Sequence, residues 1–191
     1  MVDAMQVIFT RTGERSYSIA AHRPSGAVLH MPRAPGYEPW LPHDVVHFVV
    51  ERHFDIARGV FGQLAAGGDA GTFFTVPHRR RDPARRLSSR LGALGREDTA
   101  RSERLAGACM AAWHARHGGR WAFADTVEGD EMAGLPEALL AELDEVAALW
   151  HAVSVGEALT LAWPARLTIR PGGSSRRRRQ NRDRGIAARR R

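Results

Sequence analysis

The segment LPHDVVHFVVERHF, residues 41–54, is the feature that most limits how this chain folds. Its polar residues His43, His47 and Glu51 recur at i, i+4 and i+8, and this spacing together with the length predicts an α-helix. Pro42 in the first turn and Asp44 near the positive N-terminal end agree with a helix start. The apolar residues make one side of this helix strongly hydrophobic, namely Val45, Val46, Phe48, Val49 and Val50. Such a helix has to pack against other elements.

The polar residues of this helix are candidate metal ligands. Residues in a helix turn by about 100°, so His43 and His47 stack on nearly one face and Glu51 follows one turn later. Two imidazoles at i and i+4 are a workable pair of ligands for zinc or another divalent metal. A carboxylate adds a third ligand or orients an imidazole from behind. Two alternatives stay open: plain capping and hydrogen-bonding roles, or a metal-free His–carboxylate acid–base pair.

The run from His43 to His47 resembles the His-Glu-x-x-His motif of zincin metalloproteases. In that motif the glutamate is the general base, and Asp44 stands at its position here. His53 follows His43 by ten residues, which is the ligand spacing of the metzincin branch. Val50, however, replaces the glycine that turns the metzincin chain. Ten residues of unbroken helix advance about 15 Å, so His43 and His53 are not expected to share one ion.

The rest of the chain predicts a single α+β domain over residues 1–170. Its 191 residues and 43 % hydrophobic content suit one domain with a real core, and the single Cys109 excludes an internal disulfide or a Cys-based metal cluster. β-Prone runs with turns near residues 13 and 25 predict an N-terminal antiparallel three-strand meander over residues 5–31. About three helices should pack with it. They are expected at residues 41–54, 97–117 and 135–152, with a short strand at 72–76, a closing strand within 157–170 and a mobile basic connector at 79–96.

Most of the positive charge belongs to the C-terminal tail. The chain carries +7, and residues 171–191 hold nine Arg and one Asp, so residues 1–170 carry −1. Such a segment buries too little apolar area to fold and is expected to be disordered. Its arginines, within residues 176–191, favour non-specific contact with nucleic acid or with an acidic partner. No aromatic residue is present there for base stacking.

Two segments together carry a family resemblance. LPHDVVHFVVERHF and GVFGQLAAGGDAGTF, after an N-terminal meander, resemble an uncharacterised protein family of high-GC Gram-positive bacteria. The resemblance runs from about residue 5 to residue 76, and more loosely to residue 170. It implies an ordered body and supplies no reaction. The N-terminus lacks the pattern of a secretory signal and no stretch approaches the ~18 apolar residues of a membrane span, so we expect a cytoplasmic protein without a membrane partner.

These patterns leave three classes of function. The leading expectation is a non-catalytic cytoplasmic interaction or regulatory protein. The first alternative is a metal-dependent hydrolase-like enzyme that uses His43, His47 and Glu51. The second alternative is a non-specific nucleic-acid-associated protein that acts through its tail. The surroundings of His43, His47 and Glu51 decide among these classes.

Overall fold

A four-stranded antiparallel sheet forms one side of the protein in the computed structural model, which describes residues 4–71 and 83–169. The strands are β1 (Met5–Gly13), β2 (Ser16–His22), β3 (Val28–Met31) and β4 (Ala158–Trp163), in the order β3-β2-β1-β4. The predicted meander and the closing strand are therefore confirmed. Short turns join β1 to β2 and β2 to β3, and β4 returns from the far end of the chain to pair with β1.

The three predicted helices are present, and they make the fold α+β. They are α1 (His43–His53), α4 (Arg96–Arg116) and α6 (Glu137–His151). The structure adds short elements that the sequence patterns do not predict, namely α2 (Val60–Ala65), α5 (Gly129–Ala133) and the 3₁₀ turns η1 (Ala124–Thr126) and η2 (Ala165–Leu167). The strand predicted at 72–76 and the tail at 171–191, with its expected nucleic-acid contacts, lie outside the described residues. No helix in residues 4–71 and 83–169 is long and apolar enough to cross a bilayer.

The predicted connector at 79–96 is wrong where the structure describes it, because helix α3 (Pro83–Leu94) occupies most of that range. Leu87 and Leu91 lie one turn apart, and each comes within 3.1 Å of the place where a Cβ would stand on Gly67 or Gly68. The two leucines thus anchor α3 on the turn that follows α2. The arginines are on the outer face of α3, so their density hid the helical spacing of the leucines.

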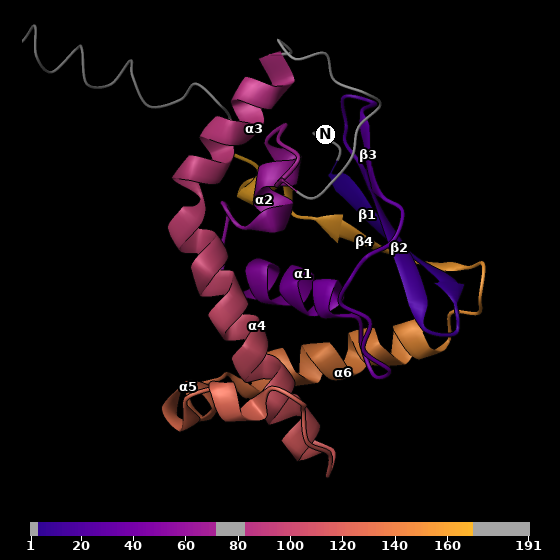
Figure 1. Ribbon diagram of the computed structural model, residues 1–191, viewed down its shortest axis with the longest axis vertical. Coiled ribbons are helices and arrows are strands. Elements are labelled where there is room, and N and C mark those ends of the chain that lie inside the picture. Colours follow the sequence, from indigo (N-terminus) through magenta and orange to yellow (C-terminus); the bar gives the residue numbers. More distant parts are fainter. Residues whose placement is uncertain (1–3, 72–82, 170–191) are drawn as a thin grey trace, which may run out of the picture.

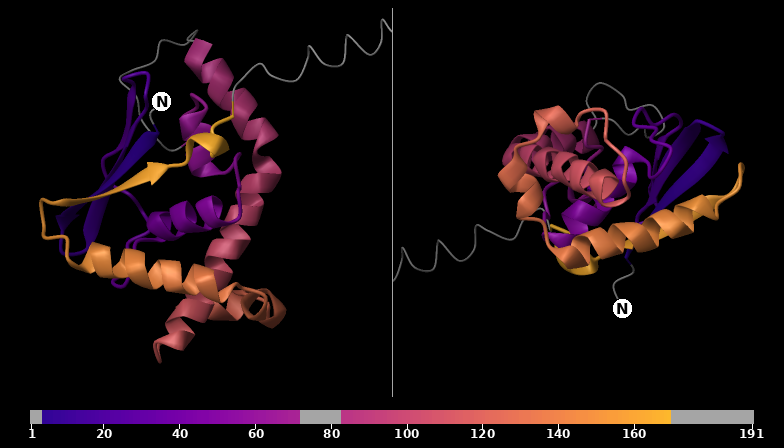
Figure 2. Two further views of the ribbon diagram at one scale, coloured as in Figure 1. Left: turned by 180° about the vertical axis from the view of Figure 1, so that it is seen from behind. Right: turned by 90° about the horizontal axis from the view of Figure 1, so that it is seen from below.

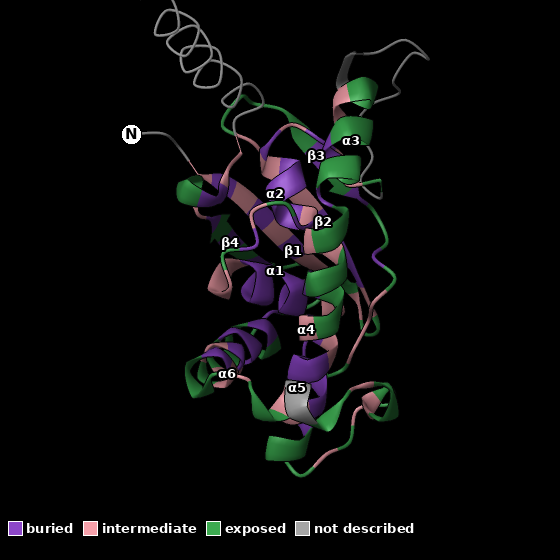
Figure 3. Ribbon diagram, turned by 90° about the vertical axis from the view of Figure 1, so that its left-hand side faces the viewer, coloured by how far each residue is buried: buried purple, intermediate pink, exposed green. Residues whose placement is uncertain are grey.

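Helix α1 is the central helix of the molecule. It lies between the sheet and α4, while α6 crosses at one end (Figures 1 and 2). The ring of Phe48 meets Phe9 of β1 and Trp163 of β4 edge to face, with ring centroids 6.3 and 5.5 Å apart. The middle of α1, from Val45 to Glu51, is buried, whereas α3 is largely exposed (Figure 3). The apolar side of α1 therefore fills the core, and His43, His47 and Glu51 on its polar side contact residues of α4.

Candidate metal centre

Three side chains from two helices converge at the crossing of α1 and α4. His43 and His47 extend from successive turns of α1, and Glu103 extends from α4. The Nε2 atom of His47 is 3.0 Å from Nε2 of His43 and 3.3 Å from Oε2 of Glu103, and the other two atoms are 4.0 Å apart. Tetrahedral zinc with bonds of 2.0–2.1 Å separates its ligand atoms by about 3.3 Å. These three atoms therefore fit around one ion with small adjustments.

A loop rich in proline and glycine holds His43 in place. Its carbonyl at Gly36 accepts a hydrogen bond of 2.9 Å from the backbone N–H of His43. A Cβ on Gly36 would stand 2.7 Å from Cβ of His43, closer than carbon atoms in contact can approach. Only glycine lets this loop pass so near the first turn of α1, and the loop becomes one wall beside the histidine.

Glu51 lies on the opposite side of His47 from the other ligand candidates. Its side chain is fully buried, and its carboxylate accepts hydrogen bonds from the backbone N–H groups of Val60 (2.8 Å) and Phe61 (3.0 Å) at the start of α2. A Cβ on Gly59 would stand 2.3 Å from this carboxylate. Glu51 thus satisfies the first amides of α2, and it is absent from the group that converges on Nε2 of His47.

Ser102 connects Glu51 to His47. Its hydroxyl donates to Oε1 of Glu51 at 3.0 Å and lies 2.8 Å from Nδ1 of His47. Because the hydroxyl proton is directed at Glu51, the Nδ1–H of His47 donates to the Ser102 oxygen. In the neutral, metal-binding form of His47, the Nε2 lone pair then faces His43 and Glu103. An acceptor behind a ligating imidazole is the usual means of fixing its tautomer and orientation in metal sites.

The ionisable groups of this network shift one another's pKa values. The adjacent imidazoles of His43 and His47 hold the pKa of Glu103 well below its usual range. Burial favours neutral His47, but the adjacent carboxylate of Glu103 and the charges of Glu51 and Asp44 outweigh burial and raise the pKa of His47. Burial raises the pKa of Glu51 to about 7 against the opposing effects of His47 and the hydrogen bonds from the amides of α2. The exposed carboxylate of Glu103 thus faces two imidazoles.

The remaining residues of the zincin-like pattern lie elsewhere. The carboxylate of Asp44, at the position of the general base, accepts a hydrogen bond from the hydroxyl of Tyr17 in β2. His53, at the position of the third metzincin ligand, lies with Nδ1 at 3.1 Å from Glu142 of α6. The protein therefore shares with that pattern only the pair of histidines at i and i+4.

The candidate centre opens onto a cavity of about 560 Å³. His43 and Glu103 line this cavity, whereas His47 is buried beneath them. Its other walls come from the 36–38 loop, from one face of α4 and from the segment around η1, and include the rings of Trp121 and Phe123. A ligand of an ion held here would enter from this side.

The sequence patterns do not identify Glu103 or Ser102 as site residues, although both lie in a predicted helix. The sequence does hold a signal for Ser102, because it falls on one line with Ala106, Cys109 and Trp113, and all four are buried. A serine on such an inner stripe needs a polar partner. Glu103 is an exposed acid among arginines and carries no comparable signal.

Comparison of the chain with protein-family models, with curated proteins and with solved structures finds no match.

Proposed function

We propose that this protein binds a divalent metal ion, in the first place zinc, through His43, His47 and Glu103 and acts as a metal-dependent hydrolase. The observation that carries the proposal is the convergence of three ligand atoms beside an open cavity. Three protein ligands with one position left open is the arrangement of catalytic zinc sites. Compared with the predicted ligand set, Glu103 takes the place of Glu51, and Glu51 supports His47 through Ser102.

The chemistry of such a site divides between the ion and the cavity. A bound divalent ion polarises a carbonyl or phosphoryl oxygen and activates water for hydrolysis. Hydrolysis also needs a proton acceptor near the reacting group. Asp44 is engaged with Tyr17, but the carboxylates of Glu38 and Glu128 both line the cavity. Glu38 and Glu128 thus provide a proton acceptor, which Asp44, at the position of the zincin general base, does not.

Metal binding is the first test. Two imidazoles and a carboxylate also suit non-haem Fe(II), so elemental analysis of the purified protein identifies the ion. Titration calorimetry of chelator-treated protein with Zn²⁺ should give one site per chain. We expect His43→Ala and Glu103→Ala each to weaken zinc binding by at least about 100-fold, because changes behind a ligand already cost 10–100-fold.

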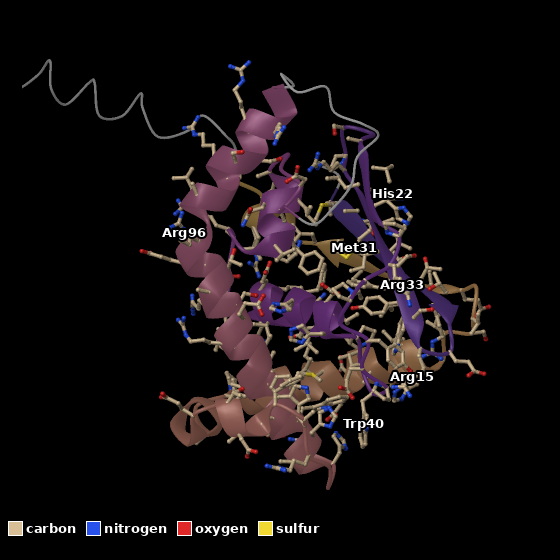
Figure 4. The ribbon with its side chains drawn as sticks, viewed as in Figure 1. Arg15, His22, Met31, Arg33, Trp40 and Arg96 are labelled. Carbon is tan, nitrogen blue, oxygen red and sulfur yellow. The ribbon has the colours of Figure 1, made fainter. Side chains whose placement is uncertain are left out.

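Matched controls separate ligand loss from general damage. His22→Ala removes an exposed histidine that projects from the sheet away from α1 (Figure 4), and Glu97→Ala removes an exposed acid from the first turn of α4. Both should bind zinc like the unaltered chain. Absence of zinc uptake, or unchanged uptake by Glu103→Ala, contradicts the proposed site. Zinc-loaded protein that hydrolyses 4-nitrophenyl esters no faster than Glu103→Ala contradicts the hydrolytic part.

A further inference from the structure

We propose that the cavity beside the candidate metal centre recognises a protonated amine carried on an apolar body, with Glu38 as the acceptor of the ammonium group. The inference rests on the proposed function in one respect, since it takes this cavity to be the substrate side of the centre. It adds the chemical class of the ligand. Binding of the amine itself requires no metal.

The charges that face the cavity favour a cation. Among the described residues that line it are three carboxylates, from Glu38, Glu103 and Glu128, and one guanidinium, from Arg104. Glu103 is occupied by the two histidines of the centre. Glu38 and Glu128 therefore give the rest of the cavity lining a negative character, which selects cationic over anionic ligands.

Glu38 itself lacks a hydrogen-bond donor. Only 23 % of its side chain is exposed, and its carboxylate forms no hydrogen bond within the described part of the chain. The nearest basic atom is Nε2 of His114, which is 3.9 Å away and is itself buried without a hydrogen-bond partner. Burial lowers the pKa of His114, so this imidazole does not supply a positive charge. A half-buried carboxylate without a donor is costly, and a ligand ammonium group relieves that cost.

The other walls provide the apolar surface. The rings of Trp121 and Phe123 pack edge to face with centroids 5.4 Å apart, and Met110 and Val127 complete this side. Phe123 is 62 % exposed, which is unusual for so large an apolar side chain. Aromatic faces attract both an apolar body and a nearby cation. The cavity thus combines an anionic point with an aromatic rim.

Three probes of one shape test the charge preference. The binding of 2-phenylethylamine, 2-phenylethanol and phenylacetate to metal-free protein is measured by calorimetry at low ionic strength and neutral pH. We expect the amine to bind at least about tenfold more tightly than phenylacetate. Glu38→Gln should reduce amine binding to the level of the alcohol. Glu145→Gln, which alters an exposed acid of α6 outside the cavity, should change nothing.

Each other outcome overturns the inference. Equal binding of the three probes, tighter binding of phenylacetate, no amine binding, or an amine affinity that survives Glu38→Gln all contradict it. Phe123→Ser alters only the exposed rim and should weaken all three probes, which places them in this cavity. Because zinc titration uses no probe and amine titration uses no zinc, failure of the metal site and failure of the amine site are read separately.

Discussion

Replacement of Ser102 by alanine tests the connection between Glu51 and His47. The change removes a buried hydroxyl and two hydrogen bonds while leaving both partners in place. The bond to the Glu51 carboxylate involves a charged group and is worth about 1.5–3 kcal/mol, and the bond from the neutral imidazole about 1 kcal/mol. Glu51 keeps its two amide donors, so we expect a loss of roughly 3 kcal/mol in the free energy of unfolding.

The same change should weaken zinc binding. Without Ser102 the ring of His47 loses the acceptor that fixes its tautomer, and loss of such a partner lowers metal affinity by about 10–100-fold. Urea unfolding followed by tryptophan fluorescence measures the stability of metal-free protein, and zinc titration measures the affinity. Ser89→Ala, an exposed serine of α3, should shift stability by less than about 0.5 kcal/mol.

The two measurements together decide the outcome. If Ser102→Ala unfolds within about 0.5 kcal/mol of the unaltered chain and binds zinc with the same affinity, the proposed linkage between Glu51 and His47 is refuted. A loss of stability with unchanged zinc affinity would leave Ser102 as a purely structural residue.

Three further predictions concern the surroundings of the site. Gly59→Ala should destabilise the fold by roughly 2 kcal/mol or more, because its Cβ would overlap the Glu51 carboxylate. Gly92→Ala in α3 has room for a Cβ and should stabilise the fold by about 0.5–1 kcal/mol. Denaturant unfolding of both variants measures this contrast, and equal effects on stability would contradict it. The pKa of Glu51 is raised from 4.5 to about 7, so between these pH values the folded protein keeps a proton that the unfolded chain has lost. The contribution of Glu51 to stability therefore falls by about 3 kcal/mol as the pH rises through 4.5–7. Glu51→Gln should remove this part of the dependence of the free energy of unfolding on pH, and an unchanged dependence would refute the prediction. Tyr17→Phe should cost about 1–3 kcal/mol of stability, because the partly buried Asp44 carboxylate loses its hydrogen-bond donor. The zinc affinity of this variant should stay within about twofold of that of the unaltered chain. A large loss of zinc affinity would show that Asp44 takes part in the metal site.

The elements predicted correctly are those whose sequence pattern matches their packing. The strands of the meander alternate or run apolar against one buried face, and short turns leave few ways to connect them. Helix α1 shows its apolar side and its polar spacing within eleven residues. The sequence predicts a connector in place of helix α3 because, among its described leucines, only Leu87 and Leu91 pack on the turn after α2, and Leu94 is exposed. The many arginines of residues 79–96 indicate a solvated segment more strongly than two leucines indicate a buried helix face.

Two of the three proposed ligands, His43 and His47, could be predicted from the sequence, and Glu103 could not. His43 and His47 share a helix face, and local geometry alone brings them together. Glu103 reaches them through the packing of α4 on α1, which no local spacing encodes. Glu51 was placed on the correct face by its i+4 spacing, yet the start of α2 at Val60 and Phe61 provides amides that hold its carboxylate. Competition from those amides, not helix geometry, sets its role.

The proposed ligands come from two helices that the chain makes far apart. His43 and His47 belong to the central helix, and Glu103 belongs to the outer α4, with α2 and α3 between them in sequence. An ion held by all three is a cross-link that closes a long loop, and it opposes separation of the outer layer from the body. Part of its binding free energy then appears as resistance to unfolding. Chelation would loosen the α1–α4 contact first and leave the sheet intact, so hydrogen exchange in α4 would report occupancy before any loss of the fold.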